Sequence, residues 1–224
     1  DPSSFSGAAC LLATYFYAFQ IYFDFSGYID IAIGSAALLG YELPVNFNSP
    51  YLASNITHFW RRWHISLSNW LRDYLYISLG GNRRGPARTY INLMITMLLG
   101  GLWHGASWHF VIWGGIHGAL LASHKLFKGD RKGDESSDIF GWKSIATFQL
   151  VCLSWIFFRA SSVTMAMTIL GSILSIPKEL FNSAVSPSHC ALVLLSSPIM
   201  LWFYFTLIFD GLILPLLTNN LLFC

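Results

Sequence analysis

Hydrophobic residues run almost without interruption through several long stretches of the chain, and polar turns separate these stretches. At about 1.5 Å of rise per residue, residues 8–39 are long enough for a helix to cross a hydrocarbon core about 30 Å thick, so we predict a transmembrane helix there. The apolar stretch over residues 89–127 could hold two short crossings and predicts a helical hairpin. Residues 145–176 and 190–217 predict further membrane helices, and the mixed charges of residues 128–138 predict a solvent loop.

A different pattern, in which tryptophans and arginines are mixed, follows the first apolar stretch. Over residues 55–78 the large apolar side chains recur at helical spacing, which places them on one face of a helix. We predict an amphipathic helix that lies in the membrane interface or re-enters the membrane, with Ser54 or Asn55 as its N-cap. Its predicted apolar face comprises Trp60, Trp63, Leu67, Trp70, Leu71 and Tyr74.

Basic residues flank the predicted hairpin on both sides. Arginines precede residue 89 and lysines follow residue 124, so the positive-inside rule places both ends of the hairpin, and the loop over residues 128–138, in the cytoplasm. His104 lies fifteen residues after Thr89, about 22 Å along a helix. That spacing predicts a position deep in the bilayer or towards its far side.

Composition supports a membrane protein. Of the 224 residues, 54% are hydrophobic and only 11% are charged, against about 25% charged in an ordinary soluble domain. The net charge of +2 provides no basic field for nucleic acid. We predict an all-α, polytopic transmembrane protein with a single domain over residues 1–224. Because the chain opens on Asp1 and Pro2, we expect it to be a piece of a longer protein.

Polar residues inside the apolar stretches are the candidates for chemistry. Glycines at positions 100, 101 and 105 remove bulk around His104, and a neutral imidazole there could accept a proton from an alcohol as a general base. The seven histidines lack the spacing of a metal site, so we expect no metal site. We expect the four cysteines to be buried and to pack as small apolar side chains. Asp24 and Asp30 should face protein or water and are expected to clamp neighbouring helices. Arg61 and Arg62 could anchor phosphates of a lipid or a cytosolic donor, or could lie at the membrane interface beside tryptophans.

Several motifs together resemble one family, the membrane-bound O-acyltransferases, in the bacterial branch of alginate O-acetylation proteins. These motifs are QIYFDFSGYIDIAIG (20–34), LPVNFNSPY (43–51), FWRRWHISLSNWLRDYLYISLGGNRRG (59–85), RTYINLMITMLLGGLWHGASWHFVIWGGIHG (88–118) and WIFFRA (155–160). The resemblance covers roughly residues 20–160 and implies the C-terminal, catalytic part of a larger protein whose N-terminal helices precede this sequence.

The resemblance also implies a reaction and a site. His104, in the WHG motif, corresponds to the family's catalytic histidine, and His64 to a second functional position. Arg61, Arg62, Trp63, Trp103 and Asp73 are further candidates for binding substrate or donor. The donor is expected to be acetyl-CoA or a similar acyl thioester, with no bound cofactor.

The expected location is the bacterial inner membrane, where the lipid bilayer, extracytoplasmic acyltransferases and the polysaccharide synthesis machinery would be partners.

The sequence is also compatible with two other classes of protein. A transporter or channel component would use the intramembrane Asp and His residues as a proton or ion relay. A non-catalytic scaffold of a polysaccharide export complex is the other.

Overall fold

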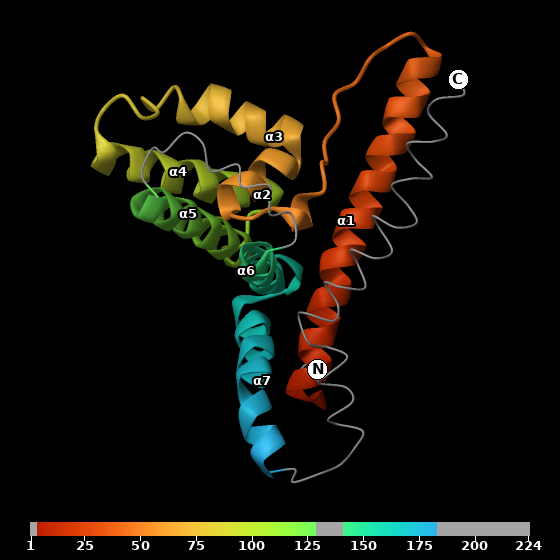
Figure 1. Ribbon diagram of the computed structural model, residues 1–224, viewed down its shortest axis with the longest axis vertical. Helices are drawn as coiled ribbons and strands as arrows, with labels where there is room; N and C mark the ends of the chain where they lie inside the picture. The colour runs from red at the N-terminus through yellow and green to blue at the C-terminus, as the bar shows by residue number, and fades with distance from the viewer. Residues whose placement is uncertain (1–3, 129–140, 183–224) are drawn as a thin grey trace. The chain divides into compact units, whose positions relative to one another are not determined.

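The computed structural model describes residues 4–128 and 141–182, and within these residues the chain is helical with no β-strand (Figure 1). The chain divides into two compact units. Residues 16–167 form one unit, and residues 1–15 together with residues 168–224 form the other. The helices α1 and α7 each contribute residues to both units.

The described residues form these helical elements in chain order. They are α1 (Gly7–Leu38), the 3-10 turn η2 (Pro50–Leu52), α2 (Ile56–Arg62), α3 (Ile65–Trp70), the π-helical segment η3 (Leu71–Tyr76), α4 (Pro86–His104), α5 (Trp108–Lys128), α6 (Trp142–Arg159) and α7 (Val163–Asn182).

Helix α1 occupies the stretch for which the sequence predicts a helix over residues 8–39, and α4 and α5 form a hairpin where one is predicted over residues 89–127. The stretch 145–176 falls on α6 and α7, which a short turn separates. Residues 190–217 and all but the first residue of 128–138 lie outside the described residues.

Across the described residues, no helix combines the length and the apolar character that a membrane crossing requires. The membrane crossings stay predictions from the sequence.

The predicted continuous helix over residues 55–78 is wrong. The segment is divided into α2, α3 and η3, and the break falls at His64, whose backbone is left-handed at φ 44° and ψ 56°. Its apolar residues consequently do not share one face: Trp63 is 4% exposed and Leu71 7%, whereas Trp70 is 54% exposed and Tyr74 70%. The N-cap prediction is confirmed for Asn55, whose side chain accepts the backbone N–H of His58 at 2.9 Å.

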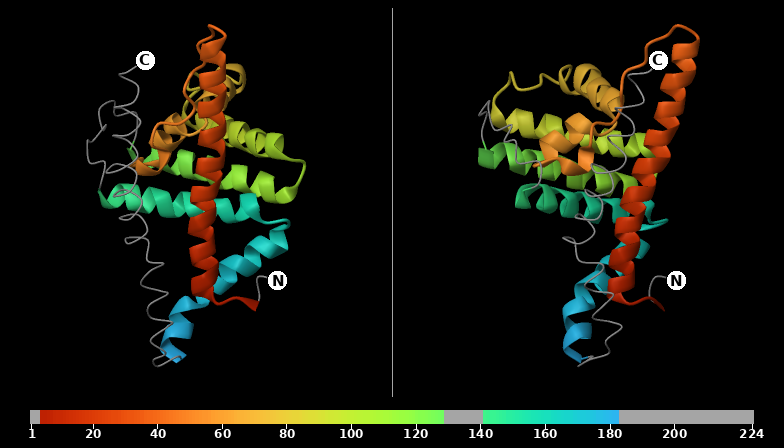
Figure 2. Two further views of the ribbon diagram at one scale, coloured as in Figure 1. Left: turned by 90° about the vertical axis from the view of Figure 1, so that its right-hand side faces the viewer. Right: turned by 45° about the vertical axis from the view of Figure 1, so that its right-hand side comes forward.

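Aromatic side chains from several helices form the core of the unit over residues 16–167. Trp63 of the α2–α3 break contacts Trp155 of α6, with ring centroids 5.1 Å apart, and Trp155 stacks on Trp113 of α5 at 5.8 Å. The Tyr51 hydroxyl donates to the carbonyl of Ala18 in α1 at 2.6 Å. In Figure 2, α4, α5 and α6 run side by side and α1 crosses them. This core fixes α1 to the breakpoint between α2 and α3.

Glycines allow α4 and α5 to pack closely. A side chain at Gly101 would meet the carbonyl of Phe110, and one at Gly114 would meet the carbonyl of Met97. Small residues at such positions let two helix backbones approach each other. The close packing holds the end of α4, where His104 lies, beside the start of α5.

In the other unit, Gly7 of α1 lies against the backbone of Ser172 in α7. Cys10 is buried there, and Cys152 is buried in the larger unit. Both agree with the prediction of small buried hydrophobes, whereas Cys190 and Cys224 lie outside the described residues.

Candidate active site

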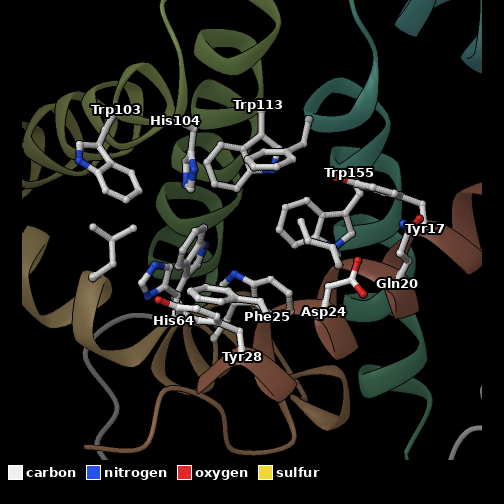
Figure 3. Close-up of a pocket in the computed structure, with 15 residues that line it drawn as sticks. Tyr17, Gln20, Asp24, Phe25, Tyr28, His64, Trp103, His104, Trp113 and Trp155 are labelled. Atoms are coloured by element: carbon white, nitrogen blue, oxygen red, sulfur yellow. The ribbon is translucent and has the colours of Figure 1, made fainter. Parts of the chain in front are cut away.

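A cavity of about 530 Å³ lies within the unit formed by residues 16–167. Side chains from α1, from α2 and α3, from the end of α4, and from α5 and α6 surround it (Figure 3). Its lining residues are Tyr17, Gln20, Ile21, Asp24, Phe25, Tyr28, Trp60, Trp63, His64, Leu67, Trp103, His104, Trp113, Trp155 and Phe158.

The cavity combines aromatic walls with a few polar groups. Most lining side chains are aromatic, and its polar groups include the two imidazoles and the side chains of Gln20 and Asp24. Among the residues that the structure describes, no lysine or arginine lines the cavity. Pockets for small molecules commonly have this character, with apolar walls and a small number of placed polar groups.

His104 is the last residue of α4 and is held by rings. Its imidazole lies edge-on to Trp103, Trp113 and Phe158, with centroid distances of 4.9, 5.3 and 5.0 Å. Within residues 4–128 and 141–182, its ring nitrogens form no hydrogen bond with the protein. In Figure 3 the ring projects into the cavity between Trp103 and Trp113. His104 thus lines the cavity with neither ring nitrogen bonded by the described residues.

His64 enters the cavity from the opposite side and is held by hydrogen bonds. Its Nδ1 lies 3.3 Å from Oδ1 of Asn46, and the same oxygen accepts the backbone N–H of Ser66 at 3.0 Å. The ring of Phe25 in α1 contacts the imidazole edge-on at 4.7 Å. Burial lowers the pKa of His64 from its ordinary value of 6.5, which favours the neutral imidazole at pH 7.

The left-handed backbone at His64 is uncommon for a residue with a side chain. Asn46 stabilises it further, because its backbone carbonyl accepts the N–H of Ile65 at 3.0 Å. Asn48 adds a backbone bond to the carbonyl of Arg62 at 3.0 Å. Non-glycine residues in such conformations cost about 1–3 kcal/mol and cluster at functional sites.

His117, by contrast, is a structural residue. It is fully buried, Nδ1 accepts the indole N–H of Trp60 at 3.2 Å, and Nε2 lies 2.8 Å from the hydroxyl of Ser154. Both ring nitrogens are therefore occupied by protein groups that tie α2, α5 and α6 together. His109 likewise bonds the carbonyl of Phe157 through Nδ1 at 3.1 Å.

The sequence model of the membrane-bound O-acyltransferase family, MBOAT, matches residues 2–132, which is more than half of the chain and includes both cavity histidines. The chain belongs to this family.

Curated relatives from three bacteria extend the family match. The chain is 53% identical over 150 residues to the "Probable alginate O-acetylase AlgI" of Azotobacter vinelandii, covering 67% of this chain and 30% of the relative. It is 49% identical over 156 residues to the "Peptidoglycan O-acetyltransferase" of Helicobacter pylori, covering 69% and 29%. It is 32% identical over 159 residues to the "Teichoic acid D-alanyltransferase" of Bacillus subtilis, covering 66% and 40%. The chain thus spans about a third of the length of these MBOAT relatives.

Four of the seven site residues predicted from the sequence meet at the cavity of this MBOAT chain: His64, His104, Trp63 and Trp103. Arg61, Arg62 and Asp73 are not among its lining residues. Asp73 is exposed and pairs with its neighbour Arg72, with Nε and Oδ1 2.7 Å apart. In these three cases sequence proximity is misleading, because each step along a helix turns the side chain by about 100°.

The wall that α1 contributes to the cavity was not among the site residues predicted from the sequence. Tyr17, Gln20 and Asp24 line the cavity at spacings of three and four residues, followed by Phe25 and Tyr28. This spacing places them on one face of the helix, and that shared face could have been predicted from the sequence. Asp30 is not among the lining residues, since six residues turn a helix by about 600° and direct its side chain about 120° away from that of Asp24.

Among residues 4–128 and 141–182, no group of three or more His, Cys, Asp or Glu side chains is placed to hold an ion.

Proposed function

We propose that this chain carries the catalytic part of a membrane-bound O-acyltransferase. In this proposal an acyl group, acetyl foremost, passes from a cytoplasmic thioester donor such as acetyl-CoA to a hydroxyl, in the O-acetylation of an exopolysaccharide such as alginate. Family membership supports acyl transfer, and two of the relatives described above are named for O-acetylation. The acetyl group and the alginate-type acceptor rest on the printed names of those relatives.

The observation that carries the proposal is the meeting of His64 and His104 at one cavity. Forty residues separate them in the chain, and they come from different motifs. The cavity's volume of about 530 Å³ lies within the range typical of ligand sites, about 300–1,000 Å³. The two histidines that we propose as functional thus line a cavity in which a small substrate could contact both.

The reaction needs one proton acceptor and one carbonyl. We propose that His104 takes the proton of the acceptor hydroxyl while the hydroxyl oxygen attacks the thioester carbonyl carbon. The carbon–sulfur bond then breaks, and His104 returns the proton to the sulfur, so that an ester and a thiol are formed. His64 orients a substrate in this scheme, and the aromatic walls limit the access of water, which would otherwise compete as the acceptor.

The phosphate groups of a donor such as acetyl-CoA need a binding site other than the cavity. Phosphates favour arginine and lysine, and neither residue type is found among the described residues that line the cavity. Asp24 would also repel a phosphate there. We therefore propose that the cavity receives the acyl end of the donor, with Arg61 and Arg62 as candidates for holding the phosphates outside it.

The remaining expectations extend the same proposal. The full-length protein would be a multi-pass protein of the bacterial inner membrane, and extracytoplasmic acyltransferases would carry the acyl group to the polymer. The lipid bilayer and the polysaccharide synthesis machinery would be its other partners. A proton or ion relay has weaker support, because Asp30 is not among the residues that line the cavity with Asp24.

The principal test replaces His104 in the full-length membrane protein. General-base catalysis contributes typically 10²- to 10⁴-fold, so His104→Ala should reduce acyl transfer from acetyl-CoA by about that factor. His58→Ala, at a histidine that does not line the cavity, is the matched control and should retain activity. Radiolabelled acetyl transfer is measured at equal amounts of folded, membrane-inserted protein. Substantial transfer by His104→Ala would reject the assignment, and ion flux without acyl donor would favour a transporter.

A second test concerns the donor's phosphates. The double variant Arg61→Ala/Arg62→Ala should raise KM for acetyl-CoA and change KM for the acceptor little. Arg72→Ala, an exposed arginine of the neighbouring segment, is the control. An unchanged KM for the donor would remove the arginine pair from the proposal.

A further inference from the structure

Asn46 provides an oxygen that three groups of one short segment share. Its Oδ1 accepts the backbone N–H of Ser66 at 3.0 Å and the Ser66 hydroxyl at 2.7 Å, and it lies 3.3 Å from Nδ1 of His64. Asn46 itself is buried, at 8% exposure, and lies in the segment before η2 rather than in α2 or α3. A long-range contact therefore holds the left-handed turn at His64.

The bond from Ser66 determines which atom of the Asn46 amide faces His64. A backbone N–H can only donate, so the atom that it meets must be the carbonyl oxygen and not the amide nitrogen. That oxygen can only accept. The Ser66 hydroxyl also lies 3.5 Å from Nδ1, and because it donates its proton to Oδ1 of Asn46 it too can only accept from the imidazole. Nδ1 of His64 must therefore carry its proton, and in the neutral imidazole Nε2 is then unprotonated.

We propose that Asn46 is a positioning residue: its side-chain oxygen selects the Nδ1–H tautomer of His64 and leaves Nε2 as a fixed hydrogen-bond acceptor at the cavity. Nε2 then binds an O–H or N–H of a substrate and cannot donate to the thioester carbonyl oxygen. This inference rests on the proposed acyl transfer for its catalytic meaning, whereas the tautomer itself does not depend on it.

The geometry supports a positioning role over a purely structural one. The backbone carbonyl of Asn46 already anchors the turn through Ile65, at 3.0 Å, without any side chain. The side-chain oxygen adds the bond to the imidazole, which lines the cavity together with His104. Phe25 contacts the imidazole edge-on but offers no hydrogen-bonding group, so the ring contact fixes the plane and not the proton.

The tautomer is measured directly by ¹⁵N spectroscopy on full-length protein labelled at histidine, with His64→Gln used to assign the His64 signals. The wild-type protein should show a protonated Nδ1 and an unprotonated Nε2 at neutral pH. Asn46→Ala should shift His64 towards the Nε2–H tautomer or a mixture, and Asn46→Asp, which keeps an acceptor oxygen, should retain Nδ1–H. Asn48→Ala, at an exposed position two residues away, is the matched control and should change nothing.

Kinetics give the second readout. Asn46→Ala should lower kcat by roughly 10- to 100-fold, the loss typical when the partner that orients a metal-bound histidine is removed. KM for either substrate should change little, and Asn46→Asp should recover most of kcat. If Asn46→Ala does not fold, the wild-type and Asn46→Asp spectra still carry the test.

Three outcomes would overturn the inference. They are an Nε2–H tautomer in the wild-type protein, an unchanged His64 tautomer in folded Asn46→Ala, and a kcat that Asn46→Asp fails to recover while its tautomer is retained. A wild-type protein that shows the Nδ1–H tautomer but transfers no acyl group would instead reject the proposed function and leave the tautomer selection standing.

Discussion

The two histidines at the cavity are held by different kinds of contact. His64 lies at a break between two short helices, on a left-handed backbone, with Nδ1 bonded to Asn46. His104 ends a long helix and is enclosed by the rings of Trp103, Trp113 and Phe158. Hydrogen bonding commits the protons of one imidazole, whereas ring contacts orient the other and no hydrogen bond from the described residues engages its nitrogens.

This difference separates two roles. A histidine that must accept a proton and return it within one turnover needs nitrogens that are open to the substrate, as those of His104 are. A histidine that orients a substrate gains from a single fixed tautomer, as His64 has. His117, with both nitrogens bonded within the protein, shows the third case of a histidine that serves packing alone.

Replacing each histidine by glutamine gives the largest expected contrast. Glutamine offers a hydrogen-bonding amide but no basic nitrogen, so His104→Gln should lose about 10²- to 10⁴-fold in kcat, as His104→Ala does. His64→Gln should retain more activity than His64→Ala, because an amide oxygen can replace an acceptor. Acetyl transfer by the full-length variants measures both effects. If glutamine retained the same fraction of activity at both positions, the proposed difference between the roles of His104 and His64 would be wrong.

Removing the rings should affect His104 more than His64. Phe158 contacts His104 at 5.0 Å and Phe25 contacts His64 at 4.7 Å, both edge-on. Phe158→Leu should lower kcat by several-fold because only rings orient His104, whereas Phe25→Leu should lower it less because Asn46 still holds His64. Each ring also lines the cavity, so KM is determined for both variants to separate orientation from substrate contact. A larger loss of kcat in Phe25→Leu would contradict this account.

The sequence allowed the long elements to be predicted better than the site between them. Apolar stretches placed helices where α1, α4 and α5 occur, and the glycines around position 101 drew attention to His104, which lines the cavity. The break at His64 could not be predicted from local pattern, because Asn46, eighteen residues earlier, stabilises it. Helical spacing could have identified Tyr17, Gln20 and Asp24, but the acids in α1 were interpreted as clamps between helices.

The left-handed backbone of His64 predicts a stability effect that is smaller than the catalytic ones. Glycine adopts this conformation at little cost, whereas alanine pays about 1–2 kcal/mol for it. His64→Gly and His64→Ala remove the same side-chain bonds. The free energy of unfolding should therefore be about 1 kcal/mol higher for the glycine variant than for the alanine variant. Chemical denaturation of the two variants in the same detergent measures the difference. A less stable glycine variant would mean that the break is not held in this conformation.

The smallest effect is expected at Asp73, which the sequence motif joined to the site and the structure separates from it. Its carboxylate bonds Arg72 at the surface, and an exposed ion pair between neighbouring residues contributes little to stability. Asp73→Asn should therefore leave kcat, both KM values and the thermal unfolding midpoint unchanged within error. Asp24→Asn, at the carboxylate that does line the cavity, is the matched comparison and should change KM for a substrate. A loss of activity in Asp73→Asn, with no change in Asp24→Asn, would contradict the assignment of the active site to the cavity. The carboxylate required for activity would then lie in η3, outside the lining residues.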